Sequence, residues 1–107
     1  MIKIILFSVL LFFHAVSVAD GFSSPSKVIE IQTQASGNFN VIVENPPTYC
    51  NSGKFRFRSG QLSVTQDGLK TALSHIMFAY SHNKDIEVFH TTSDNNCYSS
   101  TVNSTLN

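Results

Sequence analysis

Hydrophobic and polar residues alternate along several short stretches of the chain, and one longer stretch repeats with the period of a helix. Alternation of this kind is typical of strands that bury one face. It predicts strands at Lys27–Thr33, Phe39–Glu44, Lys54–Ser59 and Asp85–His90, with a weaker fifth strand at Cys97–Val102. Residues that favour turns separate the first three strands, at Ala35–Asn38, Asn45–Pro47 and Asn51–Gly53.

The same pattern assigns side chains to the two faces of each strand. In the first strand we expect one face to carry Ile29, Ile31 and Thr33, and the other to carry Val28, Glu30 and Gln32. The strand at 54–59 is the most strongly patterned in the chain. Its two phenylalanines, Phe55 and Phe57, share one face, and its three basic residues, Lys54, Arg56 and Arg58, share the other.

A helix is predicted at Gly68–His82. Its apolar side chains recur three and four residues apart, as on one face of an amphipathic helix. These residues are Leu69, Ala72, Leu73, Ile76, Met77 and Tyr80. Ser63, Thr65 and Asp67 are candidate N-caps, and Asn83 is a plausible stop. The expected order of elements is therefore β-β-β-α-β-β, which predicts one small α+β domain that is mostly β.

The first 19 residues have the features of a signal peptide. Lys3 gives a short positive start, an apolar run follows, and Ser17 and Ala19 supply small residues at a cleavage site. The apolar run is shorter than the roughly 20 residues that a spanning helix needs. We therefore predict a signal peptide at 1–19, a single domain at 20–107, a secreted or periplasmic location, and no membrane span after cleavage.

The chain has two cysteines, Cys50 and Cys97, and both follow the predicted cleavage site. Export to an oxidising compartment favours a disulfide between them. A redox or metal pair is the alternative, but the wide separation of the two residues and the lack of further cysteines speak against it.

The charge balance limits the classes of partner. Without Lys3, six basic residues face seven acidic ones, so the predicted mature domain has a formal charge of −1. Binding to nucleic acid or to an anionic membrane surface needs a basic excess or a concentrated basic face. We expect no nucleic-acid partner and no cofactor.

Candidate chemistry is sparse. His75 and His82 lie about 10.5 Å apart along the predicted helix, too far to share one metal ion. No motif of a serine nucleophile or of a glycine-rich phosphate loop is present. A small secreted hydrolase would have to assemble its site from the side chains Glu30, Glu44, Glu87, His90, Arg56 and Arg58. We predict no metal site and no catalytic residues.

The basic side chains Lys54, Arg56 and Arg58 form the first candidate binding site. Because they alternate along one strand, they point the same way and offer an anion or an acidic glycan several contacts. The competing interpretation is a solvated strand whose charges deter edge-to-edge aggregation.

The chain resembles the B subunits of bacterial A-plus-pentamer toxins, of the subtilase-cytotoxin, typhoid-toxin and pertussis type, and related small exported proteins. The residues that carry this resemblance are Tyr49-Cys50 through Lys54-Phe55, and the segment Gly68–His90. The resemblance implies a small OB-like five-stranded barrel with one amphipathic helix. It also implies a homo-pentamer, host glycans as ligands and a catalytic A subunit as partner, but it transfers no sugar-contact residue.

Three functional hypotheses follow. The leading one is a secreted, non-enzymatic binding module, of toxin B-subunit type, that recognises a host glycan or glycoprotein. The second is a monomeric secreted inhibitor or host-interaction protein, and the third is a small secreted hydrolase.

Overall fold

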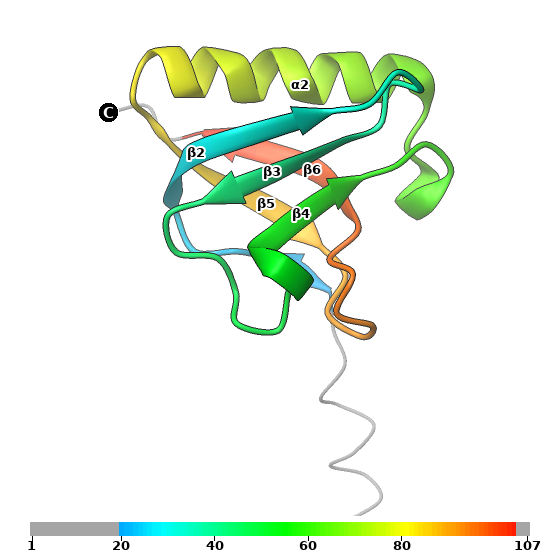
Figure 1. The fold of residues 1–107 in the computed structure, drawn as a ribbon, viewed down its shortest axis with the longest axis horizontal. Helices are drawn as coiled ribbons and strands as arrows, with labels where there is room; N and C mark the ends of the chain where they lie inside the picture. The colour runs from blue at the N-terminus through cyan, green and yellow to red at the C-terminus, as the bar shows by residue number, and fades with distance from the viewer. Residues whose placement is uncertain (1–19, 105–107) are drawn as a thin grey trace, which may run out of the picture.

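A curled β-sheet with one helix across its end makes up residues 20–104, the part of the chain that the computed structural model describes (Figure 1). The predicted signal peptide at 1–19 lies outside these residues. The strands are β1 Gly21–Phe22, β2 Ser26–Thr33, β3 Phe39–Val43, β4 Lys54–Phe57, β5 Asp85–His90 and β6 Ser99–Ser104. The helix is α2 Gln66–Ser81, and two short 3-10 turns are η1 Asn51–Gly53 and η2 Gln61–Ser63.

The sheet curls into a partly closed barrel, in which β4 comes back toward β6. β2, β3 and β4 form an antiparallel meander, and β5 pairs with β1 and with the start of β2 on one side and with β6 on the other. A parallel bridge between Arg56 and Tyr98 brings β4 back toward β6, where the Arg56 amide donates to the Cys97 carbonyl at 3.0 Å. The OB-like α+β fold and its β-β-β-α-β-β order are confirmed, with β1 as an additional strand of two residues.

A β-bulge in β2 breaks the strict alternation expected there. Val28 pairs with Val43 and Glu30 with Ile42, so Ile29 is the extra residue on its strand. Val28 is buried and Ile29 is 55 % exposed. The prediction that Ile29 and Ile31 share one face is therefore wrong, because the bulge shifts the side-chain phase by one residue.

The helix has a defined cap at each end. Thr65 is the N-cap, and its hydroxyl accepts a hydrogen bond from the Gly68 amide at 3.0 Å. At the other end Asn83 adopts a left-handed conformation with φ 55°. The Lys84 amide then reaches the Ala79 carbonyl at 2.9 Å, the pattern of a Schellman motif. The predicted stop at Asn83 is confirmed, and the helix begins two residues earlier than expected.

The buried face of α2 differs from the predicted stripe in its last turns. Leu69, Ile76 and Ala79 are buried, and Ala72 and Leu73 are partly buried against the same core. Met77 and Tyr80, which were predicted to lie on this face, are 53 % and 57 % exposed. In the last turns the line of contact with the core therefore runs through Ile76 and Ala79.

Aromatic packing fills the inside of the curled sheet. Phe39 and Phe57 stack with ring centroids 4.5 Å apart, and Phe55 is equally buried. Phe55 and Phe57 therefore share the inward face of β4, as their alternation predicts. In residues 20–104, no helix is both long and apolar enough to cross a membrane.

Candidate binding site

The segment between β3 and β4 carries Tyr49 and Cys50. Pro46 and Pro47 have no amide hydrogen to continue the β-ladder, so the chain leaves the sheet here. The Cys50 amide donates to the Pro47 carbonyl at 3.2 Å, which closes a turn around Tyr49. This turn presents Tyr49 at the surface while the next residue points inward.

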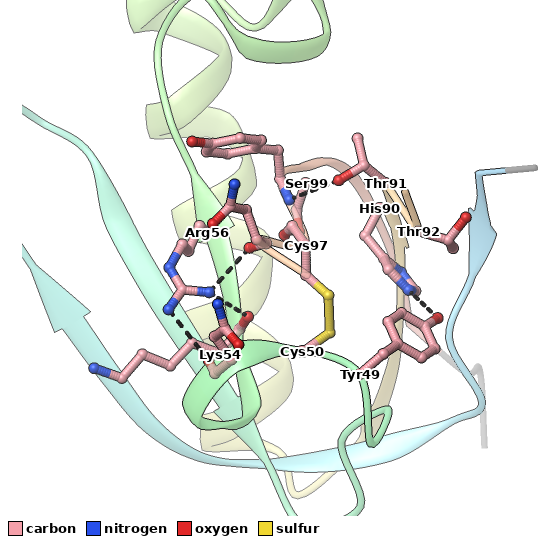
Figure 2. The surroundings of a disulfide bond; sticks show 12 residues. Tyr49, Cys50, Lys54, Arg56, His90, Thr91, Thr92, Cys97 and Ser99 are labelled. Carbon is pink, nitrogen blue, oxygen red and sulfur yellow. Dashed lines mark hydrogen bonds between the residues drawn. A yellow bond between two sulfur atoms is a disulfide. The ribbon is translucent and has the colours of Figure 1, made fainter. Parts of the chain in front are cut away.

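The disulfide between Cys50 and Cys97 anchors this turn, and the predicted pairing is confirmed. The two Cα atoms lie 5.6 Å apart, and both cysteines are buried. The bond joins the entry to β4 with the segment that leads into β6, and Figure 2 shows it between Arg56 on one side and Tyr49 and His90 on the other.

Tyr49 is held by His90, the last residue of β5 (Figure 2). The Tyr49 hydroxyl and His90 Nε2 are 2.7 Å apart, and His90 Nδ1 lies 2.9 Å from the Val88 carbonyl oxygen. Because a carbonyl only accepts, Nδ1 carries a proton, and in the neutral imidazole Nε2 then accepts from the phenol. His90 is 1 % exposed, and its ring also packs on Phe55, with centroids 5.2 Å apart.

A hollow of about 360 Å³ lies beside this pair. Its walls come from the start of the described chain and from the turn after β3, and its lining residues are Phe22, Ser23, Ser24, Asn45, Pro46, Pro47, Thr48 and Tyr49. Two of these residues are aromatic, and both are partly exposed: Phe22 is 49 % exposed and Tyr49 is 40 % exposed. Phe22 is fixed by an edge-on contact with Phe89 at 5.3 Å between centroids.

The lining of this hollow combines two kinds of surface. Aromatic and proline rings supply apolar area, and hydroxyls and one amide supply hydrogen-bond donors and acceptors. The lining residues include no charged side chain. An uncharged ligand with both apolar and hydroxyl-bearing faces fits this chemistry.

Sequence reasoning did not single out Phe22 or Tyr49 as candidates for binding. Two signals were available: a tyrosine directly before a cysteine in a turn with two prolines, and a lone aromatic residue in a serine-rich lead. Nothing local shows that these segments, far apart in sequence, form one hollow. The pairing of β1 with the end of β5 brings them together.

The three basic residues of the candidate stripe have different surroundings. The Arg56 guanidinium donates hydrogen bonds to three backbone carbonyls (Figure 2). Its Nη1 donates to the Asn96 carbonyl at 3.0 Å and to the Lys54 carbonyl at 3.4 Å, and its Nη2 donates to the Asn51 carbonyl at 3.2 Å. These contacts tie β4 to the two turns beside the disulfide. These hydrogen bonds give Arg56 a structural role that requires no ligand.

Arg58 lies one residue beyond the end of β4. Its Nη1 donates to the Phe39 and Phe57 carbonyls at 3.0 and 3.1 Å, and its Nη2 donates to Asn40 Oδ1 at 2.7 Å. Partial burial, and then the nearby charge of Arg56, lower the pKa of Arg58 below its ordinary value. Arg58 thus satisfies acceptors at the start of β3 and the end of β4.

Lys54 is half-buried, and its Nζ has no hydrogen bond or ion pair with a side chain of residues 20–104. Of the predicted stripe, Lys54 is the residue whose charge is most available to a ligand. Whether the stripe binds an anion stays a prediction.

The other groups considered for chemistry lie apart. In residues 20–104 no hydrogen bond or ion pair joins Glu30, Glu44 or Glu87 to His90 or to either arginine. His75 bonds to Ser104, and His82 bonds to a carbonyl of its own helix. A side-chain nitrogen of His90 and the two cysteine sulfurs lie within 4.8 Å of one another, but sulfurs joined in a disulfide are not thiolate ligands.

One family model matches the chain, over residues 2–105, and its description is "Family of unknown function (DUF5992)". No curated protein and no solved structure matches the chain. The resemblance to toxin B subunits therefore stays a prediction, as do the pentamer, the catalytic partner and the glycan ligand that it implies.

Proposed function

The chain belongs to the DUF5992 family of unknown function, and from its own geometry we propose that it is an exported, non-enzymatic binding domain for a neutral oligosaccharide. One observation carries the proposal. Two half-exposed aromatic rings, Phe22 and Tyr49, border a hollow whose other lining groups are hydroxyls, an amide and prolines.

Sugars fit such a surface for a physical reason. A pyranose ring has an apolar face of C–H groups that packs on an aromatic ring, and hydroxyls at its rim that exchange hydrogen bonds with short polar side chains. Ser23, Ser24, Asn45 and Thr48 supply those partners. OB-type barrels often bind oligosaccharides, which supports the same class of ligand.

The site is built for a fixed geometry. The disulfide holds the backbone next to Tyr49, and His90 holds its hydroxyl. A side chain that is already ordered loses less conformational entropy when a ligand binds. The absence of charge in the lining favours a neutral sugar over an acidic one, in contrast to the basic stripe of β4.

The disulfide supports a location outside the reducing cytosol. Secretion or export to the periplasm, a host glycoprotein as ligand, and assembly as a pentamer with a catalytic subunit are the more specific parts of this proposal.

A monomeric secreted interaction protein is the second candidate. Three large apolar side chains on the last turns of α2, those of Met77, Phe78 and Tyr80, are more than half exposed, which favours contact with another protein. The mass of the protein in solution separates this monomer from an oligomeric glycan-binding subunit.

The decisive experiment is a glycan array probed with the purified exported protein, with light-scattering mass measured alongside. We expect neutral glycans to bind, and Tyr49→Ala and Phe22→Ala to weaken binding by at least about tenfold. Tyr80→Ala removes a more exposed tyrosine, on α2, that does not line the hollow, and serves as the control. An array with no binding, or binding that survives both changes at the hollow, overturns the proposal.

A further inference from the structure

Within residues 20–104, one edge of β6 has backbone groups without hydrogen-bond partners. Val88 directs its amide and its carbonyl to Ser23, away from β6: the amide donates to Ser23 Oγ and the carbonyl accepts from the Ser23 amide, both at 2.9 Å. Val88 stands opposite Val102, so these two are a non-hydrogen-bonded pair of the antiparallel ladder. The amide and carbonyl of Val102 therefore point away from β5.

The next strand position with the same orientation is Ser104, which stands opposite Ile86. β6 pairs with β5 alone, and in residues 20–104 no backbone hydrogen bond satisfies the outward groups of Val102 or Ser104. Most amides and carbonyls of folded proteins have partners, so this edge offers donors and acceptors two residues apart.

A second hollow, of about 340 Å³, runs along this edge. Its walls are one face of α2, with Gly68, Thr71, Ala72 and His75, and the β6 residues 100–102. The spacing of the helical residues at i, i+3, i+4 and i+7 is that of a single helix face. A hydrogen bond of 2.8 Å between His75 Nε2 and Ser104 Oγ links the helix to the strand at one end.

We propose that this groove between β6 and α2 binds an extended peptide segment, which adds to β6 as a further strand. The outward backbone groups of β6 define the occupant, because only another extended chain presents donors and acceptors at the same spacing. The helix face then contacts alternate side chains of the segment. This inference is independent of the proposed glycan site, which lies at the other hollow.

The length of the groove limits how many residues of the peptide segment it can hold. Gly68 to His75 spans about 10.5 Å of helix, so the groove accommodates about three residues of extended chain. Gly68 and Ala72 are small, which suits a short apolar side chain facing the helix. Neither wall of the groove has an aspartate, glutamate, lysine or arginine, so the fitting segment is uncharged there.

The sequence of β6 lacks the charges and prolines that commonly deter strand addition at an edge. β6 has the sequence SSTVNS, with no charged residue and no proline. A folded second copy of the chain is a poorer occupant, because α2 and η2 both pack against β6 and hinder the approach of another folded domain.

The test is an NMR titration of the isotope-labelled exported protein with a panel of end-blocked pentapeptides, in which threonine alternates with alanine, valine, leucine, serine or phenylalanine. We expect at least one peptide to shift the amide signals of Val102 and Ser104 in a saturable way. Methylating the peptide's alternate backbone nitrogens removes its donors and should weaken binding by at least about tenfold.

Thr71→Arg fills the groove from an exposed position and should abolish the shifts. Lys70→Arg, its exposed neighbour that does not line the groove, is the control and should leave them unchanged. Three results overturn the proposal: no saturable shift with any peptide, equal binding by the methylated peptide, or shifts that follow protein concentration without peptide, which would assign the edge to a second copy.

Discussion

The hydroxyl of Tyr49 donates a hydrogen bond to Nε2 of His90, with 2.7 Å between the two atoms. This bond joins a surface turn to the last residue of β5, across 41 positions of sequence. It leaves the Tyr49 ring at the rim of the hollow and the His90 ring in the core. A buried histidine thus fixes the orientation of a residue that we assign to binding.

The first prediction concerns this pair. Tyr49→Phe removes the donor and leaves His90 Nε2 buried without a partner, which should cost about 1–3 kcal/mol of unfolding free energy. The aromatic ring remains, so glycan binding should be reduced far less than by Tyr49→Ala. Urea denaturation measures the first effect and the glycan array the second.

Tyr80→Phe is the matched control for stability, because the Tyr80 side chain is 57 % exposed and should change stability by less than about 0.5 kcal/mol. Equal losses from the two changes would show that the Tyr49 hydroxyl is not held by His90 in solution.

The second prediction concerns the disulfide. Replacing both Cys50 and Cys97 by serine should lower the free energy of unfolding by about 2–5 kcal/mol, because the unfolded chain without the cross-link has more conformational freedom. It should also weaken glycan binding, since Cys50 adjoins Tyr49. Denaturation of the double variant is the measurement, and titration of two free thiols in the native exported protein would contradict the bond.

Much of this fold follows from periodicity. The alternation of phenylalanine with basic residues predicts which side chains of β4 face inward, and capping residues locate both ends of α2 to within two positions. These features depend on neighbours along the chain. The Cys50–Cys97 pairing was predictable because no other cysteine competes.

The features that sequence reasoning missed depend on tertiary contacts. Ile29 continues the alternation of β2, yet a bulge turns it outward. Tyr80 continues the apolar stripe of α2, yet it is exposed, because Ala79 makes the core contact in the last turns. The hollow beside Tyr49 requires β1, which is too short to have a periodic signal of its own.

The third prediction tests the corrected face of α2. Ile76→Ala should cost about 2–5 kcal/mol, because a fully buried side chain leaves a cavity. Met77→Ala, one residue further along the same helix, should cost less than about 0.5 kcal/mol because Met77 is more than half exposed. Thermal or urea unfolding of both variants is sufficient, and similar losses would contradict this orientation of the helix.

The fourth prediction concerns the start of the exported protein. Ser17 and Ala19 place the expected cleavage before Asp20, one residue ahead of β1. Intact-mass measurement of the exported protein should give a chain of residues 20–107. An exported form that retains Met1 would refute the signal peptide.

The fifth prediction separates structural from ligand-binding roles in the basic stripe. Arg58→Gln loses charge-assisted hydrogen bonds to two carbonyls and to Asn40, and we expect a cost of about 1–2 kcal/mol because the guanidinium is only partly buried. Lys54→Gln, on the same strand face, removes no such bond and should leave unfolding in urea almost unchanged.

Because Lys54→Gln spares the fold, it is also the clean test of ligand charge. A neutral oligosaccharide bound beside Tyr49 should keep its affinity in this variant, and its affinity should not depend on salt, since no charge lines the hollow. An acidic glycan bound at the stripe should lose affinity on both counts. Salt-sensitive binding that falls in Lys54→Gln and persists in Tyr49→Ala would move the binding site from the hollow to the outer face of β4.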